Sequence, residues 1–294
     1  MWGGRRVCEI CCVNLWGIGY DAVTMAITSD AYRVRPGGKV SLKKYKTDDM
    51  GEFDSKESAH PLTQKNFEKI RDLQGVMYAE GKHALLVIFQ AMDAGGKDGA
   101  IQSIFTGVNP QGCRVTSFKQ PSLRERKHDF LWRHHVACPP KGIIGVHNRS
   151  HYEAVLVERV KNIVPKSMWK ERYEHIRVFE EMLAEEGTAV VKFFLHISKD
   201  EQKKRIQDRL NDPKKMWKFS STDVEERQFW DDYQQAYADL LEQCSTKHAT
   251  WYVVPADHKW FRNWVISDAL VRILKGLQME FPRPEKGIEN VQVV

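Results

Sequence analysis

The chain has 294 residues, and its 45 Lys and Arg outnumber its 39 Asp and Glu to give a formal net charge of +6. Hydrophobic residues make up 42% of the chain and charged residues 29%, which excludes a wholly disordered protein, a collagen-like repeat and a disulfide-dense miniprotein. The length allows one large domain or two small ones. No apolar run approaches the roughly 18 residues of a spanning helix, so we expect no membrane partner.

Residues 1–30 are expected to form an N-terminal extension outside the folded domain. More ordinary composition begins at Met25, which suggests that the biological start is Met25 and that residues 1–24 are not native. Cys8 and Cys11 have the spacing of metal ligands, but no second Cys or His pair follows at finger distance, so no zinc site is expected. The cysteines show no disulfide framework, which predicts a reducing, cytoplasmic location.

The next segments alternate between helical and strand patterns. Residues 31–60 are polar and suggest an arm or loop, whereas apolar positions at helical spacing predict a helix over 62–80. The continuous apolar run Ala84–Phe89 fits a strand buried on both faces. Strands that alternate with helices predict a parallel α/β sheet covered on both faces. With no internal repeat and no linker, one domain is expected.

Capping signals mark several further elements. Ser/Thr-x-x-Glu patterns begin at Ser122, Ser198 and Thr222, and each predicts a capping box that opens a helix. The remaining predicted strands are 115–118, 143–147, 189–197 and 251–254, and the remaining predicted helices are 97–107, 123–136, 152–160, 170–186, 199–210, 223–244 and 259–278.

The stretch from Phe89 to Gly99 has the features of a phosphate-binding loop. It follows a predicted strand and precedes a predicted helix, as such a loop requires. Small residues let backbone N–H groups close around phosphate oxygens, and the helix N-terminus favours anions. The alternative is a glycine-rich turn without a ligand. The residues that supply these features are Ala94, Gly95, Gly96, Lys97, Asp98 and Gly99.

The match to G-x-x-x-x-G-K-[ST] is imperfect at two positions. Ala91 takes the first glycine position, and Asp98 takes the Ser/Thr position that normally holds Mg²⁺. An ordinary ATPase is therefore disfavoured. Asp93, inside the loop, is the candidate metal ligand in place of the missing hydroxyl.

A second polar cluster follows the strand predicted at 143–147. Ligands bind at the carboxyl ends of strands in doubly wound sheets, so Asn148, Arg149 and Ser150 are expected to face the phosphate loop. P-loop kinases often present an Asp for the metal at such a strand end, and here the neutral Asn148 is the nearest candidate. The alternative is a solvated turn that leads into a helix.

Residues 119–141 and 203–218 are strongly basic. Arg205 and Arg209 are four residues apart, so on a helix they share a face and could grip phosphate oxygens. A solvated charged face is the alternative for either stretch alone. Two such stretches in a chain with a phosphate loop favour a polyanion site, with Lys119, Arg133, Lys215 and Lys218 as further candidates.

These residues resemble the second polyphosphate kinase family, and within it the class that phosphorylates both nucleoside mono- and diphosphates. The resemblance runs from about Tyr32 to about Leu277. It implies a P-loop kinase-like three-layer sandwich, a parallel sheet flanked by helices, with a helical lid at about 199–222 in one domain over 31–280 and a tail at 281–294. Its motifs are Gln90–Asp98, Gly107–Lys119, His128–Arg133, Asn148–Glu153, Lys214–Phe219 and Tyr252–Trp260.

The resemblance also implies an activity and residue roles. The protein would move the terminal phosphoryl group of polyphosphate to AMP or ADP by direct transfer assisted by Mg²⁺, with Mn²⁺ as an alternative ion. Asp93 would bind the metal or orient the acceptor, Lys97 would hold phosphates, and Arg149 would contact the transferring group. Glu153 falls where diphosphate-only relatives often carry Asn, which favours AMP as an acceptor. Arg133, Arg205 and Arg209 would bind phosphate chains.

Two departures from the family pattern are visible. Gly95 stands where relatives commonly have Ala, which is expected to be a mild change, and Asn148 stands where other classes have Asp. The rival functions are an ATP-dependent nucleotide or small-molecule kinase on the same fold, and a non-enzymatic polyanion-binding protein. The expected partners are polyphosphate, adenine or guanine nucleotides and further copies of the chain, with no nucleic acid.

Overall fold

A computed structural model describes residues 28–288 and 291. The predictions for Met25, for the first 24 residues and for Cys8 and Cys11 lie outside these residues. Five parallel strands form one sheet in the order β2-β3-β1-β4-β5. All five strand predictions are confirmed, and the strands are β1 (Ala84–Ala91), β2 (Cys113–Ser117), β3 (Ile144–Asn148), β4 (Thr188–His196) and β5 (Ala249–Pro255).

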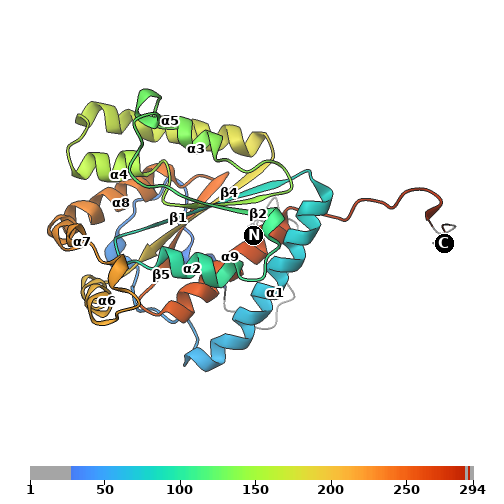
Figure 1. The fold of residues 1–294 in the computed structure, drawn as a ribbon, viewed down its shortest axis with the longest axis horizontal. Coiled ribbons are helices and arrows are strands. Elements are labelled where there is room, and N and C mark those ends of the chain that lie inside the picture. The colour runs from blue at the N-terminus through green and yellow to red at the C-terminus, as the bar shows by residue number, and fades with distance from the viewer. Residues whose placement is uncertain (1–27, 289–290, 292–294) are drawn as a thin grey trace, which may run out of the picture.

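Helices cover both faces of the sheet, so the predicted three-layer sandwich is confirmed (Figure 1). One layer holds α1 (Lys56–Glu80), α2 (Lys97–Phe105) and α9 (Lys259–Gly276), with α1 and α2 packed on α9. In the other layer α4 packs on α5 and α8. The helices outside the first layer are α3 (Trp132–Val136), α4 (Glu153–Val160), α5 (Lys166–Glu185), α6 (Lys199–Asn211), α7 (Ser221–Glu226) and α8 (Trp230–Cys244).

The chain order places a ligand crevice between β1 and β3. After β1 the chain passes through α2 to β2, which lies on one side of β1 in the sheet. After β3 it passes through α4 and α5 to β4, which lies on the other side of β1. Connections that leave neighbouring strands in opposite directions open a crevice at the carboxyl ends of those strands. β1 is buried at every position, which anchors the loop that follows it.

Two predicted helices are interrupted. The helix predicted at 123–136 is a 3₁₀ turn, Glu125–Lys127, followed by the short α3, because the Asp129 side chain accepts hydrogen bonds from the N–H groups of Leu131 (2.9 Å) and Trp132 (3.1 Å) and starts a new helix there. The helix predicted at 223–244 breaks at the 3₁₀ turn Arg227–Phe229 into α7 and α8.

The capping predictions are confirmed only in part. Ser122 and Glu125 make both reciprocal bonds of a capping box, but these open the 3₁₀ turn. Ser198 accepts a bond from the Glu201 N–H at 3.0 Å and caps α6. The prediction for Thr222 is wrong, because α7 begins two residues earlier, at Ser221, and its cap is Ser220.

The polar segment 31–60 packs against the sheet edge. Tyr32, Val34, Leu42 and Phe53 are buried in the core, and the Val34 N–H donates to the carbonyl of Trp251 in β5 (2.8 Å). The segment thereby covers an edge strand that would otherwise expose unpaired backbone groups. Within the described part of the chain, no helix is long and apolar enough to cross a membrane.

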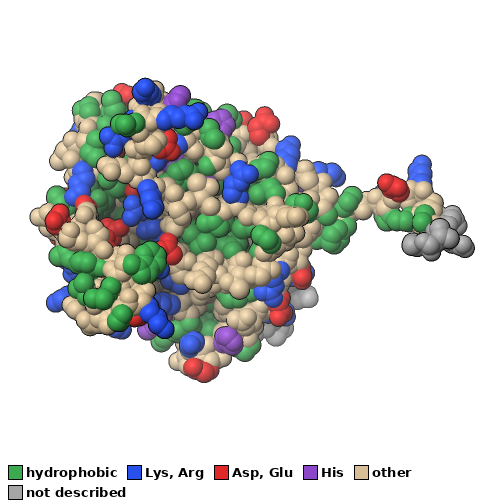
Figure 2. Space-filling view, viewed as in Figure 1, with side chains coloured by type: hydrophobic (Ala, Val, Ile, Leu, Met, Phe, Trp, Pro, Cys, Tyr) green, Lys and Arg blue, Asp and Glu red, His purple; other side chains and the backbone are tan. Residues whose placement is uncertain are grey.

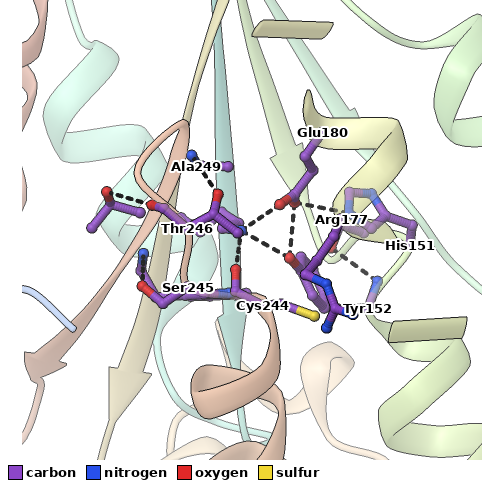
Figure 3. Close-up of polar contacts among 12 residues, drawn as sticks. His151, Tyr152, Arg177, Glu180, Cys244, Ser245, Thr246 and Ala249 are labelled. Atoms are coloured by element: carbon purple, nitrogen blue, oxygen red, sulfur yellow. Dashed lines mark hydrogen bonds and ion pairs between the residues drawn. The ribbon is translucent and has the colours of Figure 1, made fainter. Parts of the chain in front are cut away.

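One ionic cluster lies inside the core. Lys192, in the middle of β4, is fully buried and donates to the Glu180 carboxylate of α5, to the Tyr152 hydroxyl (2.9 Å) and to the Cys244 carbonyl (2.7 Å). Figure 3 shows Glu180, His151, Tyr152 and Cys244 pointing toward one another. Buried charges require such complete pairing. The Lys192 charge holds the pKa of Glu180 below its usual value although burial alone would raise it.

Candidate phosphate-binding site at the ends of β1 and β3

The loop between β1 and α2 has a backbone that only small residues tolerate. Ala94 (φ +59°) and Gly96 (φ +92°) are in left-handed conformations, and Gly96 is the N-cap of α2. A Cβ atom at Gly95 would lie 2.5 Å from the Cβ of Ala91 and 2.8 Å from the carbonyl oxygen of Met92. The expectation that Ala at this position is a mild change is therefore wrong for this backbone. The loop leads into a helix N-terminus whose first N–H groups lack intrahelical partners, which favours anions.

Lys97, the first residue of α2, folds back over this loop. Its Nζ donates to the carbonyl of Ala91 at 3.2 Å, and the side chain is half-buried. Burial and the charge of Arg149 lower the pKa of Lys97 to about 8, against the opposing effects of Asp93, Glu153 and Asp98. The ammonium therefore lies among the polar groups of both strand ends, at the position from which a phosphate-loop lysine can reach outer phosphates.

The end of β3 is tied to the loop by two side-chain contacts. Arg149 Nη2 donates to Asp93 Oδ1 at 3.1 Å, and Asn148 Nδ2 donates to Asp98 Oδ1 at 2.6 Å. Arg149 adopts a left-handed backbone (φ +63°), which is uncommon for a residue with a side chain and often marks a functional position. Lys97 lies within electrostatic reach of the Asp93–Arg149 pair. The structure thus brings together all four residues predicted to be catalytic.

Glu153 and Arg133 extend this site toward the α3 side. Glu153 begins α4, and its charge favours the charged forms of Lys97 and Arg149, so its carboxylate lies within electrostatic range of these two residues. Arg133 stacks its guanidinium 5.3 Å from the centre of the Phe118 ring and donates to the carbonyl of Lys119 at 2.8 Å. The Lys119 side chain is exposed. Arg133 lies within electrostatic range of Glu153, which places it near this end of the site.

The basic residues of 203–218 do not form the single surface that their spacing predicts. Arg205 is buried against the loop, where it donates to the carbonyls of Ala94 and Gly95. Arg209 pairs with Asp223 at 2.8 Å. Lys215 contacts Asp212 at 2.6 Å, and Lys218 lies 5.1 Å from the exposed Trp217 ring. Figure 2 shows Lys and Arg side chains, with acidic ones among them, on the side of the molecule that carries α6 and α7.

Several residues near the site were not predicted from the sequence motifs. Asp223 of α7 is close enough to Asp93, Arg149 and Lys97 to be affected by their charges, and burial and Asp93 raise its pKa. Gln202 of α6 donates to the Asp93 carbonyl at 2.9 Å. Arg262 of α9 donates to the Gly96 carbonyl at 3.1 Å. No local signal in the sequence marks Arg262, because α9 carries other charged residues such as Asp268 and Arg272.

The carboxylates of the site suit a divalent metal that shares its ligands with phosphate. Asp93, Asp98 and Glu153 surround Lys97, yet the described residues contain no group of three or more acidic, His or Cys side chains able to hold an ion alone. Mg²⁺ is usually bound by one or two carboxylates together with substrate phosphates. The residues therefore fit a metal that binds together with its substrate.

Comparison with known proteins identifies the family to which this chain belongs. The family model described as Polyphosphate kinase 2 matches residues 52–282. The chain belongs to the polyphosphate kinase 2 family. The AMP/ADP-polyphosphate phosphotransferase of Meiothermus ruber is 51% identical over 89% of this chain and 98% of its own length. The ADP-polyphosphate phosphotransferase of Rhodopseudomonas palustris is 47% identical over 92% of this chain and 98% of its own length.

A solved structure of the polyphosphate kinase 2 family has the same architecture. The crystal structure of polyphosphate kinase 2 from Arthrobacter aurescens is 39% identical, covers 92% of this chain and 97% of its own, and has a TM-score of 0.87. The P-loop kinase-like fold implied by the family resemblance is therefore confirmed. Kinases of this family generally require a divalent metal, which agrees with the carboxylates around Lys97.

The lowered pKa of Lys97 predicts a pH-dependent affinity for phosphate. Above about pH 8 the free enzyme loses the Lys97 charge, so kcat/KM for polyphosphate should fall up to tenfold per pH unit. The alkaline decrease in kcat should occur at higher pH than the decrease in kcat/KM, because bound phosphate stabilises the charged form of Lys97. Rates measured from pH 6.5 to 10 test this. Lys97→Arg should abolish the decrease near pH 8, and a wild-type kcat/KM that is flat to pH 9.5 contradicts the prediction.

Proposed function

We propose that this protein transfers the terminal phosphoryl group of inorganic polyphosphate to AMP and ADP, giving ADP and ATP. The observation that carries the proposal is the Asp93–Arg149 contact at 3.1 Å beside Lys97, which places one carboxylate and two cations at the N-terminus of α2. The names of the relatives from Meiothermus ruber and Rhodopseudomonas palustris support polyphosphate as donor and ADP as acceptor, and the first also supports AMP.

The reaction is an in-line displacement in which an oxygen of the acceptor phosphate attacks the terminal phosphorus of polyphosphate. This oxygen is already anionic, so little general-base help is needed and catalysis consists mainly of positioning and charge neutralisation. The loop amides and Lys97 hold the donor phosphates, while Arg149 contacts the transferring group. When bound, Mg²⁺ neutralises charge on the phosphate oxygens, and Asp93 would hold it. Asn148 positions Asp98, to which it is bonded.

We propose that residues 31–280 form the phosphotransferase domain, with residues 199–222 as its lid and 281–294 as a tail. Lys215 and Lys218 are exposed beyond the end of α6, where they can meet a polyanion that enters from solvent. Lys119 is exposed, and Arg133 lies near the Glu153 end of the site. A chain of phosphates could contact both pairs of residues, whereas a nucleotide triphosphate supplies only three phosphates.

Glu153 is the proposed determinant of acceptor choice. Its carboxylate lies within electrostatic range of Arg149 and Lys97, so it can act on an acceptor phosphate bound beside them. We propose adenine nucleotides as acceptors, with guanine nucleotides as an alternative, and Mg²⁺ as the metal, with Mn²⁺ as a substitute.

A cytoplasmic location fits the free thiols of Cys113, Cys138 and Cys244. The homo-oligomer implied by the family resemblance stays a prediction.

One assay distinguishes the proposed function from its rivals. The protein is mixed with Mg²⁺, polyphosphate and either AMP or ADP in the absence of ATP, and ADP and ATP are measured. We expect product from both acceptors. Turnover that requires ATP as donor would instead identify an ATP-dependent kinase, and salt-sensitive polyphosphate binding without turnover would identify a polyanion-binding protein. EDTA should abolish the reaction, and added Mg²⁺ should restore it.

A further inference from the structure

Two buried arginines contact the outer side of the phosphate loop. Arg205 of α6 donates from Nη1 to the carbonyls of Ala94 (3.3 Å) and Gly95 (3.1 Å). Arg262 of α9 donates from Nη1 to the carbonyl of Gly96 at 3.1 Å. Three consecutive loop carbonyls are thus bonded to guanidinium groups that come from two different helices. Residue 96 must be glycine for this approach, since a Cβ there would lie 2.5 Å from Arg262 Nη1.

The direction of these carbonyls decides whether the loop can bind an anion. A loop binds phosphate when successive N–H groups converge on one side, and this arrangement turns the carbonyl oxygens away from that side. A carbonyl that rotated inward would present a partial negative charge to the phosphate. Hydrogen bonds to charged donors are about twice as strong as neutral ones, so both arginines oppose such a rotation.

Each guanidinium is itself held in place. Arg205 is 7% exposed, and its remaining nitrogens bond to the Glu201 carboxylate (2.7 Å) and to the carbonyls of Ala256 and Asp257 after β5. Arg262 is 2% exposed, and Asn263 Oδ1 accepts from its Nε (3.1 Å) and Nη2 (2.8 Å). Burial leaves neither side chain room to swing into the crevice, so neither is arranged to contact the donor directly.

The charge behind the loop is only partly neutralised. Arg205 pairs with Glu201, but within the described part of the chain no carboxylate pairs with Arg262. Burial and the neighbouring Arg205 lower the pKa of Arg262 to about 9, and the pKa of Lys259 is lowered by burial and by both arginines. The site therefore maintains an excess of positive charge at an energetic cost, which an anion bound on the other side of the loop would offset.

We propose that Arg205 and Arg262 are positioning residues that hold the carbonyls of residues 94–96 outward, so that the amides of Gly96 and Lys97 stay directed at the bound phosphates. The Gly95 amide instead donates to the Met92 carbonyl at 3.0 Å and closes the turn of the loop. The proposal rests on the proposed function for the identity of the anion, and it replaces the direct phosphate contact expected for Arg205. Because Arg205 belongs to α6, it also joins the first helix of the proposed lid to the loop, and it links both to the chain segment after β5.

The test measures binding without turnover. Isothermal calorimetry with inorganic tripolyphosphate compares the wild-type protein with Arg262→Met and Arg262→Lys, and hydrogen exchange follows the amides of Gly96 and Lys97. We expect both variants to bind tripolyphosphate at least tenfold more weakly and to exchange these amides at least tenfold faster. Arg172→Met is the matched control, because Arg172 is also a buried arginine but contacts Ala154 and Glu158. It should leave both values unchanged.

Each outcome bears on a different claim. A folded Arg262→Met that binds tripolyphosphate with the wild-type Kd and exchanges its loop amides at the wild-type rate overturns the inference, as does an Arg262→Lys that behaves as wild type. A wild-type protein that does not bind tripolyphosphate contradicts the proposed function, while the exchange experiment still tests the inference. If Arg262→Met does not fold, Asn263→Ala removes the acceptor that orients Arg262, and a Kd within twofold of wild type overturns the inference.

Discussion

Replacement of Asp93 by asparagine should lower kcat for phosphoryl transfer from polyphosphate by at least about a thousandfold, equivalent to about 4 kcal/mol. Asparagine keeps the size of the side chain and can still accept a bond from Arg149, which lies 3.1 Å from Asp93 Oδ1. It removes the charge that suits a metal ligand and that balances Lys97 and Arg149. Loss of a charge that stabilises a transition state typically has an effect of this size.

Initial rates at several Mg²⁺ concentrations, with ADP as the acceptor, measure this effect. The Mg²⁺ concentration for half-maximal rate should rise in Asp93→Asn, and excess Mg²⁺ should recover only part of the rate. Asp72→Asn is the matched control, since Asp72 is exposed on α1, and it should keep the wild-type kcat. A folded Asp93→Asn with kcat within tenfold of the wild type would show that Asp93 has no central role.

Local sequence patterns were sufficient to predict the sheet and the core of the site. β1 and β4 lie almost entirely in the core, and such runs of apolar residues are typical of parallel strands. Gly95, Gly96 and Lys97 follow the first of these strands at the spacing of a phosphate loop, so the position of the site follows from local order. The meeting of Arg149 with Asp93 also follows, because parallel strands end at the same edge of a sheet.

Contacts between distant segments could not be predicted in this way. Arg205 and Arg209 have the spacing of a shared helix face, but α6 packs against the loop, so Arg205 is buried while Arg209 meets Asp223 from α7. Arg262 reaches Gly96 across 166 residues of sequence. The interruption of the helix predicted at 123–136 has a different, local reason, because the side chain of Asp129 competes with the helical backbone for hydrogen bonds.

A second large effect is expected in the core rather than at the site. Lys192→Met should lower the free energy of unfolding by about 3–5 kcal/mol, because it leaves the buried Glu180 carboxylate without its cation. The remaining partners of Glu180 are the Tyr152 hydroxyl (2.8 Å) and His151 Nε2 (3.2 Å). Urea unfolding at pH 7 measures this loss.

A second substitution at Glu180 separates the missing charge from the missing side-chain volume. In Lys192→Met/Glu180→Gln the unpaired charge is gone, while the glutamine can still accept the bond from Tyr152, so at least half of the lost stability should return. The exposed pair Arg177–Glu174 is the control, because Glu174→Gln should cost less than about 1 kcal/mol, as is usual for surface pairs. If the double variant is no more stable than Lys192→Met, the loss arises from packing around the methionine, and an unpaired Glu180 charge does not explain it.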